Sequence, residues 1–210
     1  MLQNAELARW NERFSAPDYI FGTAPNAFLA SKAALFRPGQ RALCVADGEG
    51  RNSVWLAQQG LEVTAFDISP VGVAKARKLA AERGVRVAHE VASVYEWSWP
   101  TRPSFDVAAA IFVQFADPAM RRFLFQRMAA SLKPGGLVLI EGYTPRQLEY
   151  KTGGPSQIEN LYTAELLRSS FPRFEVLELR EYEAELEEGS RHAGRSALID
   201  FVARNGREPE

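Results

Sequence analysis

Cysteine, histidine and long apolar runs are scarce in this chain, and each scarcity argues against a class of function. Cys44 is the only cysteine among 210 residues, which excludes a disulfide within the chain and a thiolate metal site. His89 and His192 are the only histidines, so no histidine-based metal centre is expected. No apolar run approaches the ~18 residues that a membrane span needs, and the sequence therefore predicts no membrane segment.

The chain also has no excess of charge of one sign. The formal net charge is −1, and acidic and basic residues alternate along the chain, so no basic footprint for nucleic acid is present. The 46% hydrophobic and 24% charged residues are typical of a globular protein in a reducing cytoplasm. We expect a single domain over 1–210, with an N-terminal helical lid at 1–36 and a core at 37–205; the oligomeric state is not predicted.

Strand-like and helix-like segments alternate over most of the chain. The expected helices are 3–14, 25–36, 51–59, 69–83 and 118–132. The expected strands are 41–46, 61–66, 85–90, 105–113 and 137–143, followed by a long hairpin made of 174–186 and 195–204. This order predicts an α/β fold, a Rossmann-like doubly wound sheet of seven strands, mostly parallel with an antiparallel C-terminal hairpin and helices on both faces.

Two neighbouring strand ends carry the residues of a candidate pocket. The first strand ends in Asp47-Gly48-Glu49-Gly50, and the second ends in Asp67. Ligands of open α/β sheets bind beyond the carboxyl ends of the strands. Glycines there let a ligand approach the backbone, and a carboxylate accepts hydrogen bonds from the two hydroxyls of a ribose. The alternative role for Asp67 is capping the next helix, but Ser69 is already placed as that cap.

The glycine spacing argues against a dinucleotide. Such a site needs G-x-G-x-x-G, and Ser53 stands where the third glycine would be. A phosphate-binding G-x-x-x-x-G-K loop is missing as well. A nucleoside without a pyrophosphate therefore fits better than NAD, although an NAD-dependent oxidoreductase stays the alternative enzyme.

Several stretches in a fixed order resemble one family over nearly the whole chain. They are "WNERF…YIFGTAPNAFL", "ADGEGRNSVWLA", "VTAFDISPVGVAKA", "FDVAAAIFVQF", "LKPGGLVLIEGY" and "GGP…LY". The chain is similar to Rossmann-like S-adenosylmethionine-dependent methyltransferases, specifically the tellurite-resistance and thiopurine-type branch. The resemblance implies transfer of a methyl group from S-adenosyl-L-methionine, which leaves S-adenosylhomocysteine.

The resemblance also implies roles for individual residues in cofactor binding. Gly48 and Gly50 would pass under the methionine portion, and Asp67 would hold the ribose. Ile68, Ser93 and Val94 would surround the adenine, and Phe112 would close the methionine end. Trp10, Phe14 and Gly22 would come from the N-terminal lid. Asp47 and Glu49 either contact the cofactor or favour the following helix, and Asn52 is a further polar candidate.

The acceptor side is predicted from the later segments. His192 is the candidate general base, and Arg191 and Arg195 beside it are candidates for holding an anionic acceptor; an exposed loop is the alternative for all three. Tyr143 and Arg146 follow the fifth strand, where substrates bind. We expect a small-molecule acceptor, such as a thiol, a chalcogen oxyanion or another soft nucleophile.

Three positions depart from the family pattern. Cys44 replaces an acidic residue, Ala46 replaces a glycine, and Ser93 stands where many members have an aspartate. These departures leave open a protein that binds S-adenosylmethionine without turnover. His89 is assigned to the structure of its strand.

Overall fold

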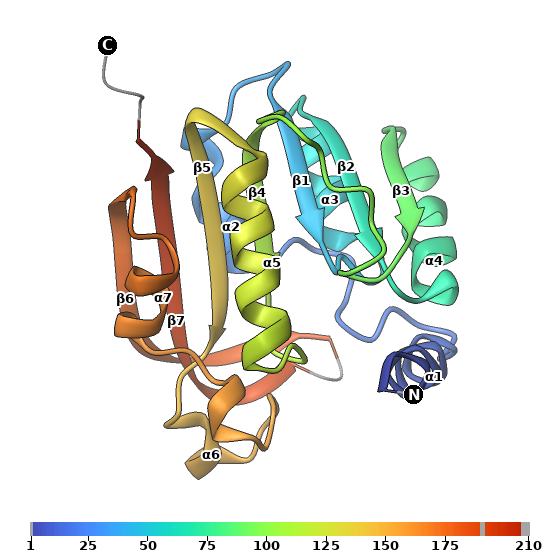
Figure 1. Ribbon diagram of the computed structural model, residues 1–210. Helices are drawn as coiled ribbons and strands as arrows, with labels where there is room; N and C mark the ends of the chain where they lie inside the picture. Colours follow the sequence, from blue (N-terminus) through green and yellow to red (C-terminus); the bar gives the residue numbers. More distant parts are fainter. Residues whose placement is uncertain (1, 190–191, 207–210) are drawn as a thin grey trace. The chain divides into compact units, whose positions relative to one another are not determined.

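The computed structural model describes residues 2–189 and 192–206, which divide into two compact units. The first comprises 2–98 with 188–189, and the second comprises 99–187 with 192–206. Figure 1 shows the elements of each unit.

The first unit is built on three parallel strands in the order β3-β2-β1. Their register pairs Arg41 with Glu62 and Thr64 with Ala88. The elements of this unit are α1 (Leu2–Phe14), α2 (Ala27–Ser31), the 3₁₀ turn η1 (Ala33–Leu35), β1 (Arg41–Val45), α3 (Arg51–Gln58), β2 (Glu62–Asp67), α4 (Pro70–Glu82) and β3 (Val87–Val91).

The second unit is built on four strands in the order β4-β5-β7-β6. The pair β4–β5 is parallel, and β5–β7 is antiparallel with Glu141 opposite Asp200. The elements of this unit are β4 (Phe105–Ile111), α5 (Pro118–Ser131), β5 (Leu132–Tyr143), α6 (Gln147–Tyr150), the 3₁₀ turn η2 (Ile158–Asn160), α7 (Ala164–Ser170), β6 (Phe174–Glu188) and β7 (His192–Asn205).

The seven strands make a mixed sheet, mostly parallel with antiparallel C-terminal strands, and helices pack against them. This confirms the predicted fold class. Among the described residues, no helix is both long enough and apolar enough to cross a membrane.

Helix starts follow the expected capping chemistry. Ser69 Oγ accepts from the amide of Gly72, and Pro70 occupies the first helical position of α4. Asp117 caps α5 in the same way, by accepting from the amides of Ala119 and Met120. These caps fix where α4 and α5 begin, directly after the strand ends that carry the candidate site.

The second predicted helix is shorter than expected. The prediction was 25–36, but α2 ends at Ser31 and continues only as the turn η1. Asn26 caps its start with its own side chain, which accepts from the amide of Leu29. The chain leaves η1 at Phe36 in an extended conformation, and Pro38 then disfavours helix at Arg37, the residue before it.

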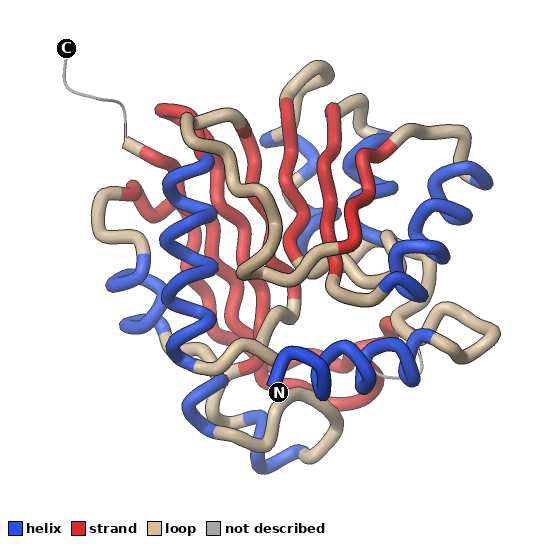
Figure 2. Tube along the Cα trace, turned by 45° about the vertical axis from the view of Figure 1, so that its right-hand side comes forward, coloured by secondary structure: helices blue, strands red, loops and turns tan. Residues whose placement is uncertain are grey.

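Helix α1 lies beyond the carboxyl ends of the strands of its own unit, as Figures 1 and 2 show. It packs on the start of α4, where Asn11 Oδ1 accepts from Ser69 Oγ at 2.6 Å. The N-terminal segment therefore covers the edge of the sheet at which the glycine-rich loop ends.

Candidate functional site

Three residues of the loop after β1 have positive φ angles, which residues other than glycine rarely adopt. Gly48 and Gly50 have φ angles of 61° and 89°, and Ala46, which replaces the family's glycine, has 49°. A Cβ on Gly50 would lie 2.6 Å from the Cβ of Ala76 in α4. Gly50 therefore allows the loop to approach α4 closely, and it places α3 behind the loop.

Asp67 connects the ends of β1 and β2. Its carboxylate accepts from the amide of Gly48 at 2.9 Å and from the amide of Ser69 at 2.8 Å. The sequence analysis expected Ser69 to leave Asp67 free; in fact two backbone amides already hold it. Burial raises the pKa of the Asp67 carboxyl to about 6, against the opposing effect of these two bonds.

Phe14 covers the loop from α1. Its side chain is 2% exposed, and a Cβ on Gly48 would lie 3.1 Å from its ring. Trp10 stacks on Phe14 at 5.3 Å between ring centroids, and Phe21 meets it edge-on at 6.4 Å. Of the two aromatics predicted in the N-terminal lid, Phe14 is buried against the glycine loop, and Trp10 is half-buried.

Glu49 holds the N-terminal segment. Its side chain accepts from the amide of Ile20 at 2.9 Å and pairs with Lys75 of α4 at 2.7 Å. Lys75 in turn donates to the carbonyls of Ala16 and Asp18. These bonds give Glu49 a contact with the segment before α2, which neither of its two predicted roles included.

Asp47 belongs to a buried polar chain that the sequence did not reveal. Ser53 Oγ donates to Asp47 Oδ2, and His89 Nε2 lies 3.2 Å from Ser53 Oγ. Burial raises the pKa of the Asp47 carboxyl to about 7 and, together with Arg77, lowers the pKa of His89 to about 4. His89 therefore has the structural role that was assigned to it, supporting the loop through Ser53.

The tip of the β6–β7 hairpin contributes a residue that sequence reasoning missed. Glu188 pairs with Arg51 at 2.7 Å and accepts from the amide of Ala27 and from Asn26 Nδ2. Asn52 Oδ1 accepts from the backbone amide of Asn26. The start of α3, the start of α2 and the hairpin tip are thus joined in one network.

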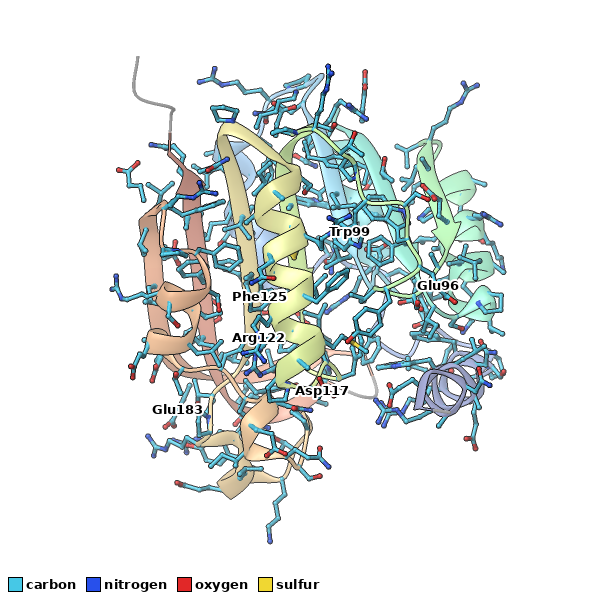
Figure 3. All side chains as sticks on the ribbon, viewed as in Figure 1. Glu96, Trp99, Asp117, Arg122, Phe125 and Glu183 are labelled. Atoms are coloured by element: carbon cyan, nitrogen blue, oxygen red, sulfur yellow. The ribbon has the colours of Figure 1, made fainter. Side chains whose placement is uncertain are left out.

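Gly22 and the residues predicted around the adenine lie in the same unit. Gly22 has a φ of 72° and lies beside Gly189 of the hairpin tip. Ser93 and Val94 are buried after β3, and Ile68 is half-buried. Ser93 Oγ donates to Glu96 at 2.8 Å, a residue labelled in Figure 3, so its hydroxyl stabilises the turn that ends the strand.

In the second unit, three predicted residues form an aromatic cluster. The ring of Phe112 lies 4.8 Å from that of Tyr143 and 4.3 Å from that of His192. Phe112 has a φ of 54°, which turns the chain sharply after β4. Gln114 fixes Tyr143 by bonding both its amide and its carbonyl. The candidate base and the predicted cofactor-closing ring are therefore in direct contact.

Two of the arginines predicted on the acceptor side share one carboxylate. Arg146 and Arg195 both pair with Glu183, at 2.5 and 2.6 Å, and Figure 3 labels this glutamate. Hydrogen bonds from Arg195 lower the pKa of Glu183. Both arginine side chains are exposed, at 59% and 60%. Arg191, the third predicted arginine, lies outside the described residues.

Comparison with known proteins identifies part of the chain. Residues 42–136 match the family model described as "Methyltransferase domain". The chain is 33% identical over 115 residues to a ubiquinone biosynthesis O-methyltransferase of Xanthomonas campestris pv. campestris (strain B100), a match that covers 54% of this chain and 46% of that protein. The chain thus spans about half the length of the curated relatives that it matches.

Solved structures share the fold over more of the chain. TehB from Haemophilus influenzae superposes with a TM-score of 0.70 at 18% identity, covering 93% of this chain and 67% of that one. Magnesium protoporphyrin IX methyltransferase from Synechocystis PCC 6803, solved with bound SAH, gives 0.71 at 16% identity, covering 98% and 99%. TehB is one such neighbour among others, so the fold does not single out the tellurite-resistance branch. The match of residues 42–136 to a methyltransferase domain and the methyltransferase names among the structural neighbours agree with the enzyme class and cofactor predicted from the sequence.

Proposed function

We propose that this chain transfers a methyl group from S-adenosylmethionine to a small-molecule acceptor. The observation that carries the proposal is the bond between the amide of Gly48 and the carboxylate of Asp67, at adjacent strand ends inside the matched methyltransferase domain. It brings the glycine loop and the ribose-binding candidate together in the arrangement that a nucleoside needs.

The chemistry of these residues fits the cofactor. A carboxylate has about four lone-pair positions, and two backbone amides use two of those of Asp67. The remaining positions suit the two ribose hydroxyls. A side chain on Gly48 or Gly50 would meet Phe14 or Ala76, so the loop admits a ligand only because both residues are glycine.

The remaining cofactor residues are assigned by the same proposal. Asp67 holds the ribose, Gly48 and Gly50 pass under the methionine portion, and the N-terminal lid excludes water. The full proposed set is Trp10, Phe14, Gly22, Asp47, Gly48, Glu49, Gly50, Asn52, Asp67, Ile68, Ser93, Val94 and Phe112.

The acceptor is proposed to be a soft nucleophile, a thiol or a chalcogen oxyanion. S-adenosylmethionine supplies an activated methyl group, and the protein has to align the nucleophile and remove its proton. The proposed base is His192, whose ring contacts those of Phe112 and Tyr143. With a thiol acceptor, His192 would take up the proton that the thiol loses when it is methylated. Arg146 and Arg195 would hold an anionic acceptor.

A hydroxyl acceptor is the second candidate, and the curated relatives favour it because they are named O-methyltransferases. A hydroxyl has a higher pKa than a thiol, so it depends more strongly on a general base. The two candidates therefore differ in how much His192 matters.

The test is transfer of labelled methyl from S-adenosylmethionine to three acceptors: a small thiol, tellurite and a catechol. The proposal predicts a methylated product with at least one of them. His192→Gln should lower kcat about a hundredfold for the catechol and much less for tellurite, which has no proton to lose once ionised. The exposed variant Arg168→Gln is the control. If the protein binds S-adenosylmethionine but forms no product with any of the three acceptors, the result would favour a protein that binds the cofactor without turnover. If it binds NADH instead, the result would support the alternative of an NAD-dependent oxidoreductase.

A further inference from the structure

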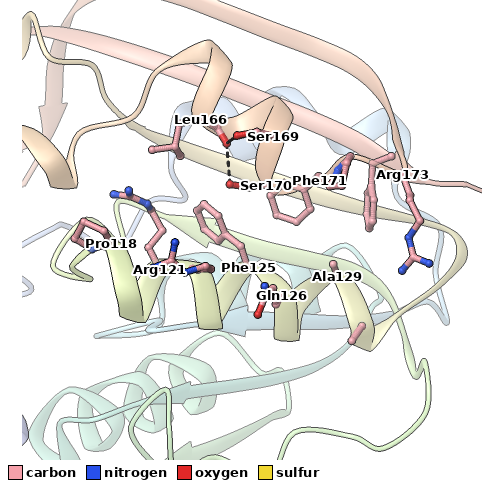
Figure 4. A pocket seen from close by; sticks show the side chains of 14 residues that line it. Pro118, Arg121, Phe125, Gln126, Ala129, Leu166, Ser169, Ser170, Phe171 and Arg173 are labelled. Atoms are coloured by element: carbon pink, nitrogen blue, oxygen red, sulfur yellow. Dashed lines mark hydrogen bonds between the residues drawn. The ribbon is translucent and has the colours of Figure 1, made fainter.

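A groove runs between α5 and α7 of the second unit, outside every residue proposed above for the cofactor or the acceptor. Its volume is about 590 Å³. From α5 it is lined by one stripe of side chains, at positions 118, 121, 122, 125, 126, 129 and 130, and α7 and the start of β6 form the opposite wall (Figure 4). The stripe follows the three- and four-residue spacing of a helix face, so the groove runs along the helix.

The floor of the groove is aromatic. Phe125 and Phe171 are buried, with their ring centroids 5.4 Å apart, and Phe174 lies 5.3 Å from Phe171. The hydroxyls of Ser169 and Ser170 donate to the carbonyl of Leu166, as the dashed lines in Figure 4 show. Their protons are therefore already used, and the groove offers an apolar surface with few free donors other than its arginines.

The charge of the groove has one sign. Arg121, Arg122 and Arg173 line it, and the lining contains no aspartate or glutamate. Within 2–189 and 192–206, none of the three is in an ion pair with a carboxylate, although the chain contains 26 acidic residues. Arg121 donates to the carbonyl of Glu159, and burial lowers the pKa of its guanidinium. The nearby Asp117 is occupied as the cap of α5.

Several arginines elsewhere in the chain pair with a carboxylate instead. Arg51, Arg146, Arg195 and Arg204 each pair with a glutamate. Three guanidinium groups that lack such a partner, gathered around an aromatic floor, are complementary to a ligand that carries a negative charge on an apolar body. The volume lies within the range of about 300–1,000 Å³ that is typical of small-molecule sites.

We propose that the α5–α7 groove is a binding site for a small amphiphilic anion, a carboxylate, sulfonate or phosphate attached to an aromatic or alicyclic body. The anion pairs with Arg122 and Arg121 or with Arg173, and the apolar body packs on Phe125 and Phe171. Arginine is suited to this role because its planar fork pairs with such groups and also stacks on rings.

The test uses two fluorescent probes with the same aromatic body on the full chain. One is 8-anilinonaphthalene-1-sulfonate, and the other is N-phenyl-1-naphthylamine, which lacks the sulfonate. The anion should bind saturably with one molecule per chain, and at least about tenfold more tightly than the neutral probe. Raising the salt concentration from 0.05 to 0.5 M should weaken the binding of the anionic probe but not that of the neutral probe.

Substitutions locate the binding. Arg122 and Arg173 are exposed, so Arg122→Gln and Arg173→Gln should leave the fold intact and weaken the anionic probe about threefold to tenfold. Ala130→Glu, which adds a negative charge at the exposed rim, should weaken it further. Arg168→Gln removes the same charge from α7 outside the groove and should change nothing. S-adenosylhomocysteine binding should be the same in all variants.

Three results would overturn the proposal. One is equal affinity for the two probes, and another is equal behaviour of Arg122→Gln and Arg168→Gln. The third is binding of an acidic helical peptide that depends on these arginines while the small anion does not bind, which would assign the groove to a protein partner instead.

Discussion

One set of carboxylates in each unit is held in opposite ways, Asp47 and Asp67 in the first and Glu183 in the second. In the first, Asp47 and Asp67 are buried, and burial raises the pKa of both. Asp67 is held by backbone amides, whose positions are fixed by the strand ends. In the second, Glu183 is held by arginine side chains that are largely exposed, and its pKa is lowered. The first arrangement is suited to a ligand of fixed shape, the second to one that varies.

The largest effect is expected where the glycine loop meets α4. Gly50→Ala places a Cβ 2.6 Å from Ala76 at a φ of 89°, so it combines a clash with left-handed strain. It should lower the free energy of unfolding by about 3 kcal/mol. Gly84→Ala has a similar φ of 67° but meets nothing within 4 Å, so it should cost only about 1 kcal/mol. Chemical denaturation of both variants measures the difference, and equal costs would show that the loop does not depend on its contact with α4.

The buried chain Asp47–Ser53–His89 should make stability depend on pH in two opposing ways. The groups that act on Asp47 are Ser53, Asp67 and Arg51, and its own charge acts on Cys44. Because the pKa of Asp47 is raised from 3.8 to about 7, its ionisation destabilises the fold as pH rises across that window. Because the pKa of His89 is lowered from 6.5 to about 4, its protonation in the unfolded state destabilises the fold as pH falls across that window.

Substitution separates the two contributions. Relative to the native chain, the free energy of unfolding of Asp47→Asn should rise by about 4 kcal/mol as the pH goes from 4 to 7. That of His89→Gln should rise by about 3 kcal/mol as the pH goes from 6.5 to 4. Urea denaturation at five pH values measures both. Parallel curves for the native chain and Asp47→Asn would contradict the raised pKa.

A smaller effect is expected at the hairpin tip. Glu188→Gln keeps an acceptor for Ala27 but removes the charge that faces Arg51, whose side chain is only 8% exposed. It should cost about 1–2 kcal/mol. The neighbouring exposed Glu187→Gln is the matched control. A double-mutant cycle with Arg51→Gln measures the coupling energy between Glu188 and Arg51. A coupling energy near zero would show that this pair does not stabilise the fold.

The smallest structural effect is expected at Glu183. Arg195→Gln leaves Arg146 paired with Glu183, and both arginines are exposed, so the melting temperature should not shift measurably. If Arg195 holds an anionic acceptor, KM for that acceptor should rise severalfold while kcat is kept. A large drop in melting temperature would show that the pair serves the fold rather than the acceptor.

The sequence predicted the features that local chemistry determines. The Ser69-Pro70 start of α4 followed from capping preference, and the buried β4 followed from its unbroken apolar run. The shortened α2 was missed because the apolar pattern of 25–36 runs on past Ser31, where the helix ends, with no glycine or proline to mark the end.

Contacts between segments that are distant along the chain could not be predicted from the sequence. Nothing local links Glu188 to Arg51, or His89 to Ser53, since 137 and 36 positions separate them along the chain. The neighbouring strand ends of β1 and β2 were predictable because parallel pairing places them side by side, but the amide of Gly48 as a partner of Asp67 was not. The one available signal for the buried chain was a histidine in a strand, and that signal fits many structural roles.

Calorimetric titration with S-adenosylhomocysteine is the most direct test of whether the glycine loop and Asp67 form the cofactor pocket. The native chain should bind one equivalent, Asp67→Ala should weaken binding about a hundredfold or more through the loss of charge-assisted hydrogen bonds, and the exposed control Glu62→Ala should bind as the native chain does. Equal affinity of Asp67→Ala and the native chain, or binding of NADH in place of S-adenosylhomocysteine, would contradict the claim.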